Sequence, residues 1–180
     1  MSNLNPAIAP NTIKITPANE CVSLKCNFKN LAREVKMIRG EIIDTMCNVE
    51  SAIGYVLASL QKHGQYHKIL KTVQPQLGGM LLALQAAMKI EFSHQSKLKK
   101  FEPLIPALLE ALEIRNLMAH AEIKIATFES LDFFLLLSYN EFEKGVPRLF
   151  ERTTSITELK KKSQKLVSLY GKIENLRQDW

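Results

Sequence analysis

Residues 27–61, "NFKNLAREVKMIRGEIIDTMCNVESAIGYVLASLQ", carry the pattern that decides the fold. Their apolar residues recur at steps of three or four along the chain: Leu31, Val35, Ile38, Ile42, Met46, Val49, Ile53, Val56 and Leu60. Because an α-helix completes a turn in about 3.6 residues, these side chains share one face. The stretch therefore predicts one long amphipathic helix whose apolar face must be covered by other elements.

Further helices are expected downstream of this one. Apolar spacing predicts a second helix over residues 77–92 and a third from about Pro103 to His120. Ser155 and Glu158 have the spacing of a capping box, which predicts the start of a last helix running through residues 159–176. These segments supply the partners that the long helix needs.

Between the third and the last helix the period of the sequence changes. Ile123 and Ile125 alternate with charged residues, and "LDFFLLLSY" (131–139) is rich in aromatic and apolar residues, as is typical of strands. "NEFEKG" (140–145) indicates a turn, and "VPRLFERT" (146–153) indicates a returning strand. The predicted fold class is therefore mainly α: a helical bundle with a small antiparallel β-sheet inserted before the C-terminal helix.

The 180 residues are enough for one domain with a real core. Residues 1–20 contain Pro6, Pro10 and Pro17 and are expected to form a flexible N-terminal arm, which leaves residues 21–180 as a single domain. No export signal and no unbroken apolar run of roughly 18 residues occurs, so the expected location is the cytoplasm and not a membrane. The three cysteines lack zinc-ligand spacing, and we expect no metal and no cofactor.

Charge and histidine placement give weaker signals. The net charge of +6 slightly favours an anionic partner such as nucleic acid. The basic clusters at residues 93–100 and 160–165 are interpreted as solvated faces, with contact to an RNA backbone as the alternative. His63 and His67 are interpreted as surface residues, because Gly64 separates them and a third metal ligand is missing nearby.

Two charged residues sit among apolar neighbours in the predicted helices. The positions three, four and seven residues from Glu50 are uncharged, and so are the positions three and four residues from Arg115 and the one seven residues before it. Burying either charge alone would cost several kcal/mol, so the two are natural partners if the first and third helices pack together. A half-buried structural ion pair would explain both residues without any function.

A polar stripe lies beside this arginine. Glu113, Asn116 and His120 are spaced at i, i+3 and i+7 and therefore share a helix face. A histidine that moves a proton, an amide that orients it and an arginine that neutralises charge on phosphorus are the groups that phosphodiester cleavage without a metal requires. The alternative is that His120 is only a favourable charge near the helix C-terminus.

At these residues the sequence resembles the HEPN superfamily, whose motif is an arginine, a polar residue and then a histidine near the end of a helix. "RNLMAH" places Arg115, Asn116 and His120 in that motif. "GEIIDTMCNVESAIGYVLASL" (40–60) resembles the first long HEPN helix, in which Glu50 faces the motif, and "AAMKIEF" (86–92) resembles the second. The resemblance covers roughly residues 30–178, with Ala121 standing where the family often has glycine.

The resemblance implies a HEPN-like domain that dimerises with two motifs in one shared cleft. It implies a metal-independent endoribonuclease of the toxin or antiviral-defence type that cleaves RNA by attack of the 2′-hydroxyl. Arg115, Asn116, His120 and Glu50 would be its catalytic residues, and RNA, a second copy and an antitoxin or defence-system protein its partners. The alternative is a HEPN-like module that binds a nucleotide, RNA or protein without cleaving.

Overall fold

The computed structural model describes residues 22–71, 73, 76–91, 93–127, 133–143 and 146–180. The predicted N-terminal arm, residues 1–20, lies outside them. The helices are α1 (Val22–Gln61), α2 (His67–Leu70), α3 (Leu77–Met88), α4 (Gln95–Lys99), α5 (Ile105–His120) and α6 (Ile156–Arg177), with short 3₁₀ turns at Gly64–Tyr66 and Glu102–Leu104. The strands are β1 (Glu122–Thr127), β2 (Phe133–Glu143) and β3 (Val146–Thr154). A mainly helical fold with a small antiparallel sheet before the last helix is thus confirmed.

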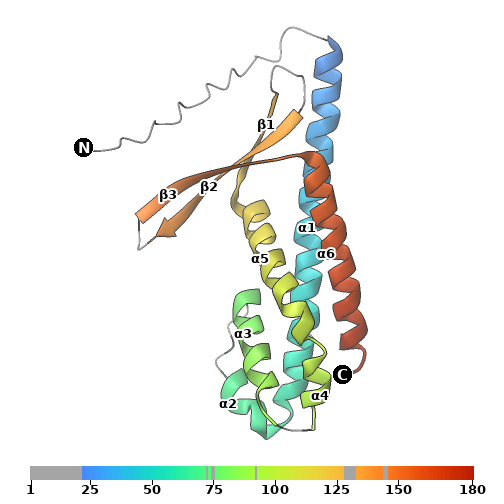
Figure 1. The fold of residues 1–180 in the computed structure, drawn as a ribbon, viewed down its shortest axis with the longest axis vertical. Helices are drawn as coiled ribbons and strands as arrows, with labels where there is room; N and C mark the ends of the chain where they lie inside the picture. Colours follow the sequence, from blue (N-terminus) through green and yellow to red (C-terminus); the bar gives the residue numbers. More distant parts are fainter. Residues whose placement is uncertain (1–21, 72, 74–75, 92, 128–132, 144–145) are drawn as a thin grey trace, which may run out of the picture.

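The two longest helices lie side by side and run in the same direction, whereas α5 runs in the opposite direction (Figure 1). Lys160 of α6 forms an ion pair with Glu34 of α1, and the Ser163 hydroxyl donates a 2.6 Å hydrogen bond to Glu41. The residue numbers of these two contacts increase along both helices, from Glu34 to Glu41 in α1 and from Lys160 to Ser163 in α6, as expected for parallel helices. The shorter helices α2, α3 and α4 gather around the end of the bundle where α1 finishes (Figure 1).

The apolar face of α1 forms the centre of the core. Its predicted stripe is buried from Val35 to Leu60, and only Leu31 at the upper end is half-buried. Leu108 and Met118 of α5 and Ile173 of α6 pack into the same cluster without exposure to solvent. The spacing of apolar residues therefore determined both the helix and the face it buries.

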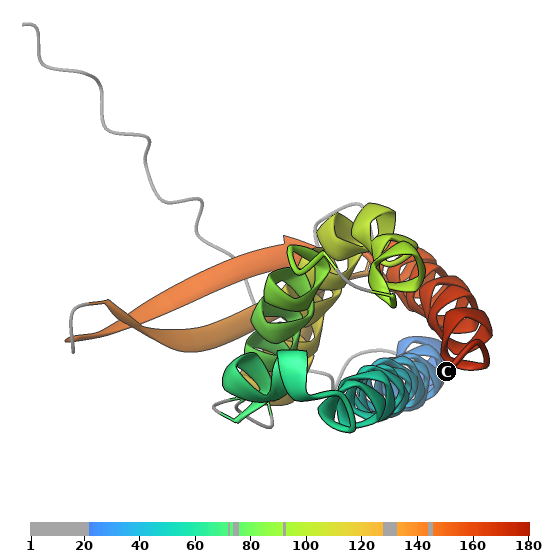
Figure 2. The same ribbon diagram turned by 90° about the horizontal axis from the view of Figure 1, so that it is seen from below.

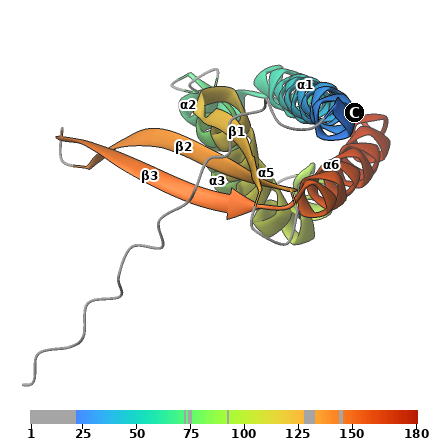
Figure 3. The same ribbon diagram turned by 90° about the horizontal axis from the view of Figure 1, so that it is seen from above.

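The sheet joins α5 to α6 and has the order β1-β2-β3, with both pairs antiparallel. β2 and β3 continue as a ribbon that projects away from the helices, as Figures 2 and 3 show from opposite directions. The predicted capping box follows directly: Glu158 N–H donates to the Ser155 hydroxyl oxygen at 3.1 Å, and Ser155 N–H donates to the Glu158 carboxylate at 3.2 Å. This cap fixes the direction in which the chain leaves the sheet.

Three boundaries differ from the predictions. Residues 140–143 continue β2 instead of turning, since Asn140 pairs with Leu149 and Glu143 with Val146. A projecting ribbon is held by backbone hydrogen bonds and needs no buried face, so its polar residues are tolerated. α3 ends at Met88 and not at residue 92, because the Lys89 and Ile90 amides bond to carbonyls three residues earlier. The basic segment 93–100 contains the short helix α4.

No helix within the described part of the chain is both long and apolar enough to cross a membrane.

Candidate functional site

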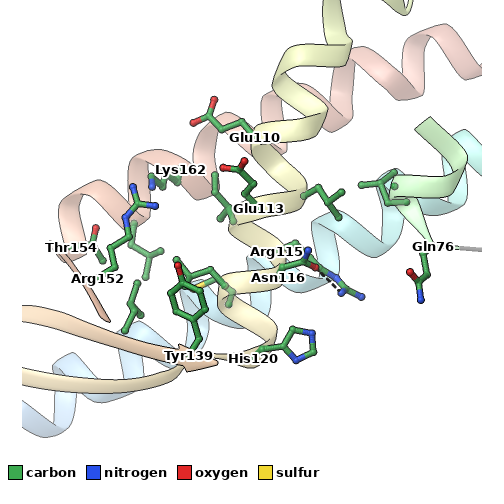
Figure 4. Close-up of a pocket in the computed structure, with 18 of the residues that line it drawn as sticks. Gln76, Glu110, Glu113, Arg115, Asn116, His120, Tyr139, Arg152, Thr154 and Lys162 are labelled. Atoms are coloured by element: carbon green, nitrogen blue, oxygen red, sulfur yellow. Dashed lines mark hydrogen bonds between the residues drawn. The ribbon is translucent and has the colours of Figure 1, made fainter. Parts of the chain in front are cut away.

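An open pocket of about 960 Å³ lies along the last three turns of α5, from Glu110 to His120. One wall is α5 itself, and the others come from the beginning of α3, the sheet and the beginning of α6 (Figure 4). All four residues predicted from the sequence line it: Glu50, Arg115, Asn116 and His120. The fold thus brings the residue from α1 to the same cavity as the three from α5.

Arg115, Asn116 and His120 project from one side of α5 (Figure 4). Arg115 is half-buried, while Asn116 and His120 are exposed. The Arg115 guanidinium donates a 3.2 Å hydrogen bond from Nη1 to the Asn116 amide oxygen. The remaining guanidinium N–H groups and the amide N–H₂ have no hydrogen bond to another described residue, so this pair presents mainly donors to an incoming group.

Arg39 of α1 fixes the end of the helix that carries His120. Its Nη2 donates a 3.2 Å hydrogen bond to the carbonyl oxygen of Ala119. The last carbonyls of a helix have no partner within the helix and favour a nearby cation. Arg39 therefore holds the C-terminal turn of α5 against α1, a role that the sequence analysis missed although Arg39 borders the apolar stripe beside Ile38 and Ile42.

Ala121 stands at the position where a glycine was expected, and its backbone conformation does not require one. It ends α5 with φ −73° and ψ 139°, an extended conformation open to any residue. Its methyl group is buried at 3% exposure, and its N–H donates to the carbonyl of Leu117 at 2.8 Å. The turn after His120 thus has no need of a glycine.

The predicted ion pair between Glu50 and Arg115 is not formed. Both residues line the pocket and both are half-buried, but within the described residues no carboxylate lies within 4.0 Å of the Arg115 guanidinium. The apolar neighbours of Glu50 and Arg115 along their helices suggested that both charged groups are buried and that each needs an oppositely charged partner. In the folded chain the pocket gives both side chains access to water, so neither charge requires the other.

The opposite wall of the pocket contains residues that the sequence analysis did not single out. These are Tyr139 of β2, Arg152 of β3 and Lys162 of α6 (Figure 4). Lys162 was assigned only to a solvated basic cluster; it is half-buried at the pocket wall. The alternation of β2 and β3 was the one available signal, because it places Tyr139 on the same face as the buried Leu135 and Leu137.

Among the residues with described positions, no group of three or more His, Cys, Asp or Glu side chains is arranged to hold a metal ion. Comparison of the chain with protein-family models, with curated proteins and with solved structures finds no match.

Proposed function

We propose that the chain is a HEPN-type, metal-independent endoribonuclease. The observation that carries the proposal is the gathering of Arg115, Asn116 and His120 on one side of α5, in an open pocket that Glu50 also lines. An exposed histidine beside a half-buried arginine offers a proton carrier next to a fixed cation. This combination suits a reaction that moves protons on oxygen while negative charge gathers on phosphorus.

In the proposed reaction the 2′-oxygen of a ribose attacks the adjacent phosphorus, and the bond from phosphorus to the 5′-oxygen breaks. The 2′-hydroxyl loses its proton to a base, and the departing 5′-oxygen gains a proton from an acid. His120 exchanges these protons, while Arg115 donates hydrogen bonds to the phosphoryl oxygens. The products are a 2′,3′-cyclic phosphate and a 5′-hydroxyl.

The proposal includes a homodimer in which two copies of α5 face each other. Leu109 of α5 and Leu82 of the contacting helix α3 are large apolar residues with 48% and 70% exposure, which favours a partner surface here. Two motifs in one cleft would supply one histidine as base and a second as acid. Light scattering at micromolar concentration should give twice the chain mass of 20.4 kDa. A monomer would exclude the shared cleft.

The decisive experiment is RNA cleavage in the presence of EDTA. Wild-type protein should cut labelled RNA, leave a cyclic phosphate end and spare DNA of the same sequence, because DNA lacks the 2′-hydroxyl. His120→Ala should abolish cleavage, whereas His67→Ala, which removes an exposed histidine from another part of the fold, should not. Wild-type protein that leaves single-stranded and structured RNA intact would favour the alternative, a binding module without catalysis.

A further inference from the structure

Two aromatic rings stack on the ribbon beside the pocket. Tyr139 and Phe150 are direct partners in the pairing of β2 with β3, with ring centroids 5.7 Å apart and planes inclined by 22°. Tyr139 lines the pocket and is half-buried, and Phe150 is 37% exposed. A stacked pair of aromatic rings with an exposed member offers a flat surface at the mouth of the cavity.

The strand register explains how Tyr139 comes to line the pocket with Phe150 beside it. Leu137 pairs with Arg152, and Tyr139 pairs with Phe150, so the four side chains share one face of the ribbon. Leu137 is buried in the core and Arg152 lines the pocket. The aromatic pair lies two residues nearer to the tip of the β2–β3 ribbon on this face.

Two cations line the same side of the pocket as Tyr139 (Figure 4). Arg152 is exposed and Lys162 is half-buried, and neither forms an ion pair with another described residue. The Glu158 carboxylate, which feels the charge of both, already accepts hydrogen bonds from the Thr154 hydroxyl at 2.9 Å and from the Ser155 N–H at 3.2 Å. Both cations therefore keep donors for a further anion.

Two of the acidic residues that line the pocket, Glu110 and Glu113, lie on the side of α5 that faces Lys162 (Figure 4). Glu113 and Glu110 stand seven and ten residues before His120 on α5 (Figure 4), so Glu110 is about 15 Å from it along the helix axis. A polyanion would be repelled by these carboxylates and would meet Arg152 and the aromatic rings nearer to Tyr139. The charges thus favour a path from Arg115 and His120 toward the ribbon rather than along α5.

We propose that Tyr139 and Phe150 form a stacking subsite for an unpaired nucleobase, with Arg152 and Lys162 receiving the neighbouring phosphate. Every nucleobase has a flat face that stacks on aromatic rings, but a base inside a duplex has both faces covered. The subsite therefore selects RNA that is single-stranded next to the phosphate at Arg115. This inference rests on the proposed function for the position of that phosphate, while binding itself does not depend on cleavage.

The test measures binding of a fluorescently labelled single-stranded RNA by the full chain carrying His120→Ala, so that the RNA stays intact. Tyr139→Leu should weaken binding roughly tenfold, in the range measured for loss of one stacked base. Tyr139→Phe keeps the ring and should bind like the parent protein. The control is Tyr55→Leu, which removes a tyrosine ring that is exposed, lies outside the pocket lining and has Arg177 5.1 Å from its centroid; it should change nothing.

Salt dependence tests the cations separately. Arg152→Gln and Lys162→Gln should each reduce the slope of log binding constant against log salt concentration by roughly one. Lys160→Gln, two residues from Lys162 but paired with Glu34, should leave the slope unchanged. A fully paired RNA duplex of the same sequence should bind at least tenfold more weakly than the single strand.

Two results would overturn the subsite: equal binding by parent and Tyr139→Leu proteins with the same helical circular dichroism, or equal binding of single strand and duplex. Selective loss of binding to a protein partner in Tyr139→Leu, with RNA binding intact, would also overturn it. Failure of the proposed function looks different. If the wild-type protein binds single-stranded RNA through Tyr139 but does not cut it, the subsite stands and the proposed enzymatic activity is excluded. If the Tyr139→Leu variant cuts RNA as well as the wild type does, the enzymatic activity stands and the subsite is excluded.

Discussion

The two ends of the helical bundle each contain a histidine, and the two are placed in opposite ways. His120 ends α5, is exposed and lines an open pocket. His94 lies at the other end, just before α4, with its ring 4.4 Å from that of His63 and 5.5 Å from that of Trp180, measured between centroids. One imidazole can meet a ligand, whereas the other is packed among rings.

The environment of His94 is that of a structural contact. Lys97 lies 5.6 Å from the centroid of the Trp180 ring and donates a 2.7 Å hydrogen bond to the Asp179 carbonyl, and Lys100 forms a 2.9 Å ion pair with the Asp179 carboxylate. These contacts fasten the end of α6 to α4. Burial first, and then the charges of His63 and Lys97, lower the pKa of His94 below its usual 6.5. His63, predicted to be a surface residue, is instead half-buried in this cluster.

The comparison shows that the surroundings of a histidine, and not its local sequence, determine whether its ring is open to a ligand. Both histidines sit at helix ends near basic residues. Only at His120 do the neighbouring elements leave space for a substrate, and only at His94 do they close around the ring. Variants at the two ends should therefore affect different properties of the protein.

The largest effect is expected at the pocket. In the proposed reaction both residues act on the same transition state, so His120→Ala and Arg115→Ala should each lower the rate of RNA cleavage by on the order of a hundredfold or more. The double variant should be little slower than either single one, since residues that act as a unit are not additive. Rates under single-turnover conditions check this, with His94→Gln as the control from the other end. A double variant whose losses multiply would show that the two residues act independently.

A smaller effect, on stability, is expected at His94. Its folded pKa lies below that of the unfolded chain, so at acidic pH the unfolded state binds this proton more readily than the native state. The free energy of unfolding should therefore be highest above about pH 6.5 and fall as the pH drops through the folded pKa. The ion pair with Lys100 lowers the pKa of Asp179 below 3.8, so Asp179 stays charged through this range.

Urea titrations at pH 8 and pH 5 measure this loss, and the only tryptophan, Trp180, reports on the same cluster by its fluorescence. His94→Gln should show less of the acid-dependent loss than the parent protein. His67→Gln, which changes an exposed histidine outside the cluster, should keep it. Identical pH dependence of the parent and His94→Gln proteins would mean that the cluster does not hold His94 in its neutral form.

The smallest effect is expected at Glu50. A buried pair with Arg115 would make Glu50→Ala cost roughly 3–5 kcal/mol, but without an ion pair the free energy of unfolding should change by less than about 1 kcal/mol. Asp44→Ala on an exposed position of the same helix is the matched control. Similar urea midpoints for the two variants support the structure, and a large loss confined to Glu50→Ala would restore the predicted pair.

Several features of this protein followed from the sequence with little help from tertiary structure. The long helix, the third helix up to His120 and the capping box at Ser155 depend on apolar spacing and on hydrogen bonds between near neighbours. Such signals act over a few residues, and the rest of the fold does not contradict them here. The same local logic failed at residues 140–143, where pairing with a distant strand outweighed a polar, turn-like composition.

The sequence by itself placed Arg115, Asn116 and His120 on one helix face, because helical geometry fixes which neighbours share a face. Only the tertiary structure decided what surrounds them. It separated Glu50 from Arg115, attached Arg39 to the end of α5 and brought Tyr139, Arg152 and Lys162 to the opposite wall of the pocket. The physical reason is that the burial of a charge, and the partners it meets, depend on elements that pack together from distant parts of the chain, which periodicity within one helix does not specify.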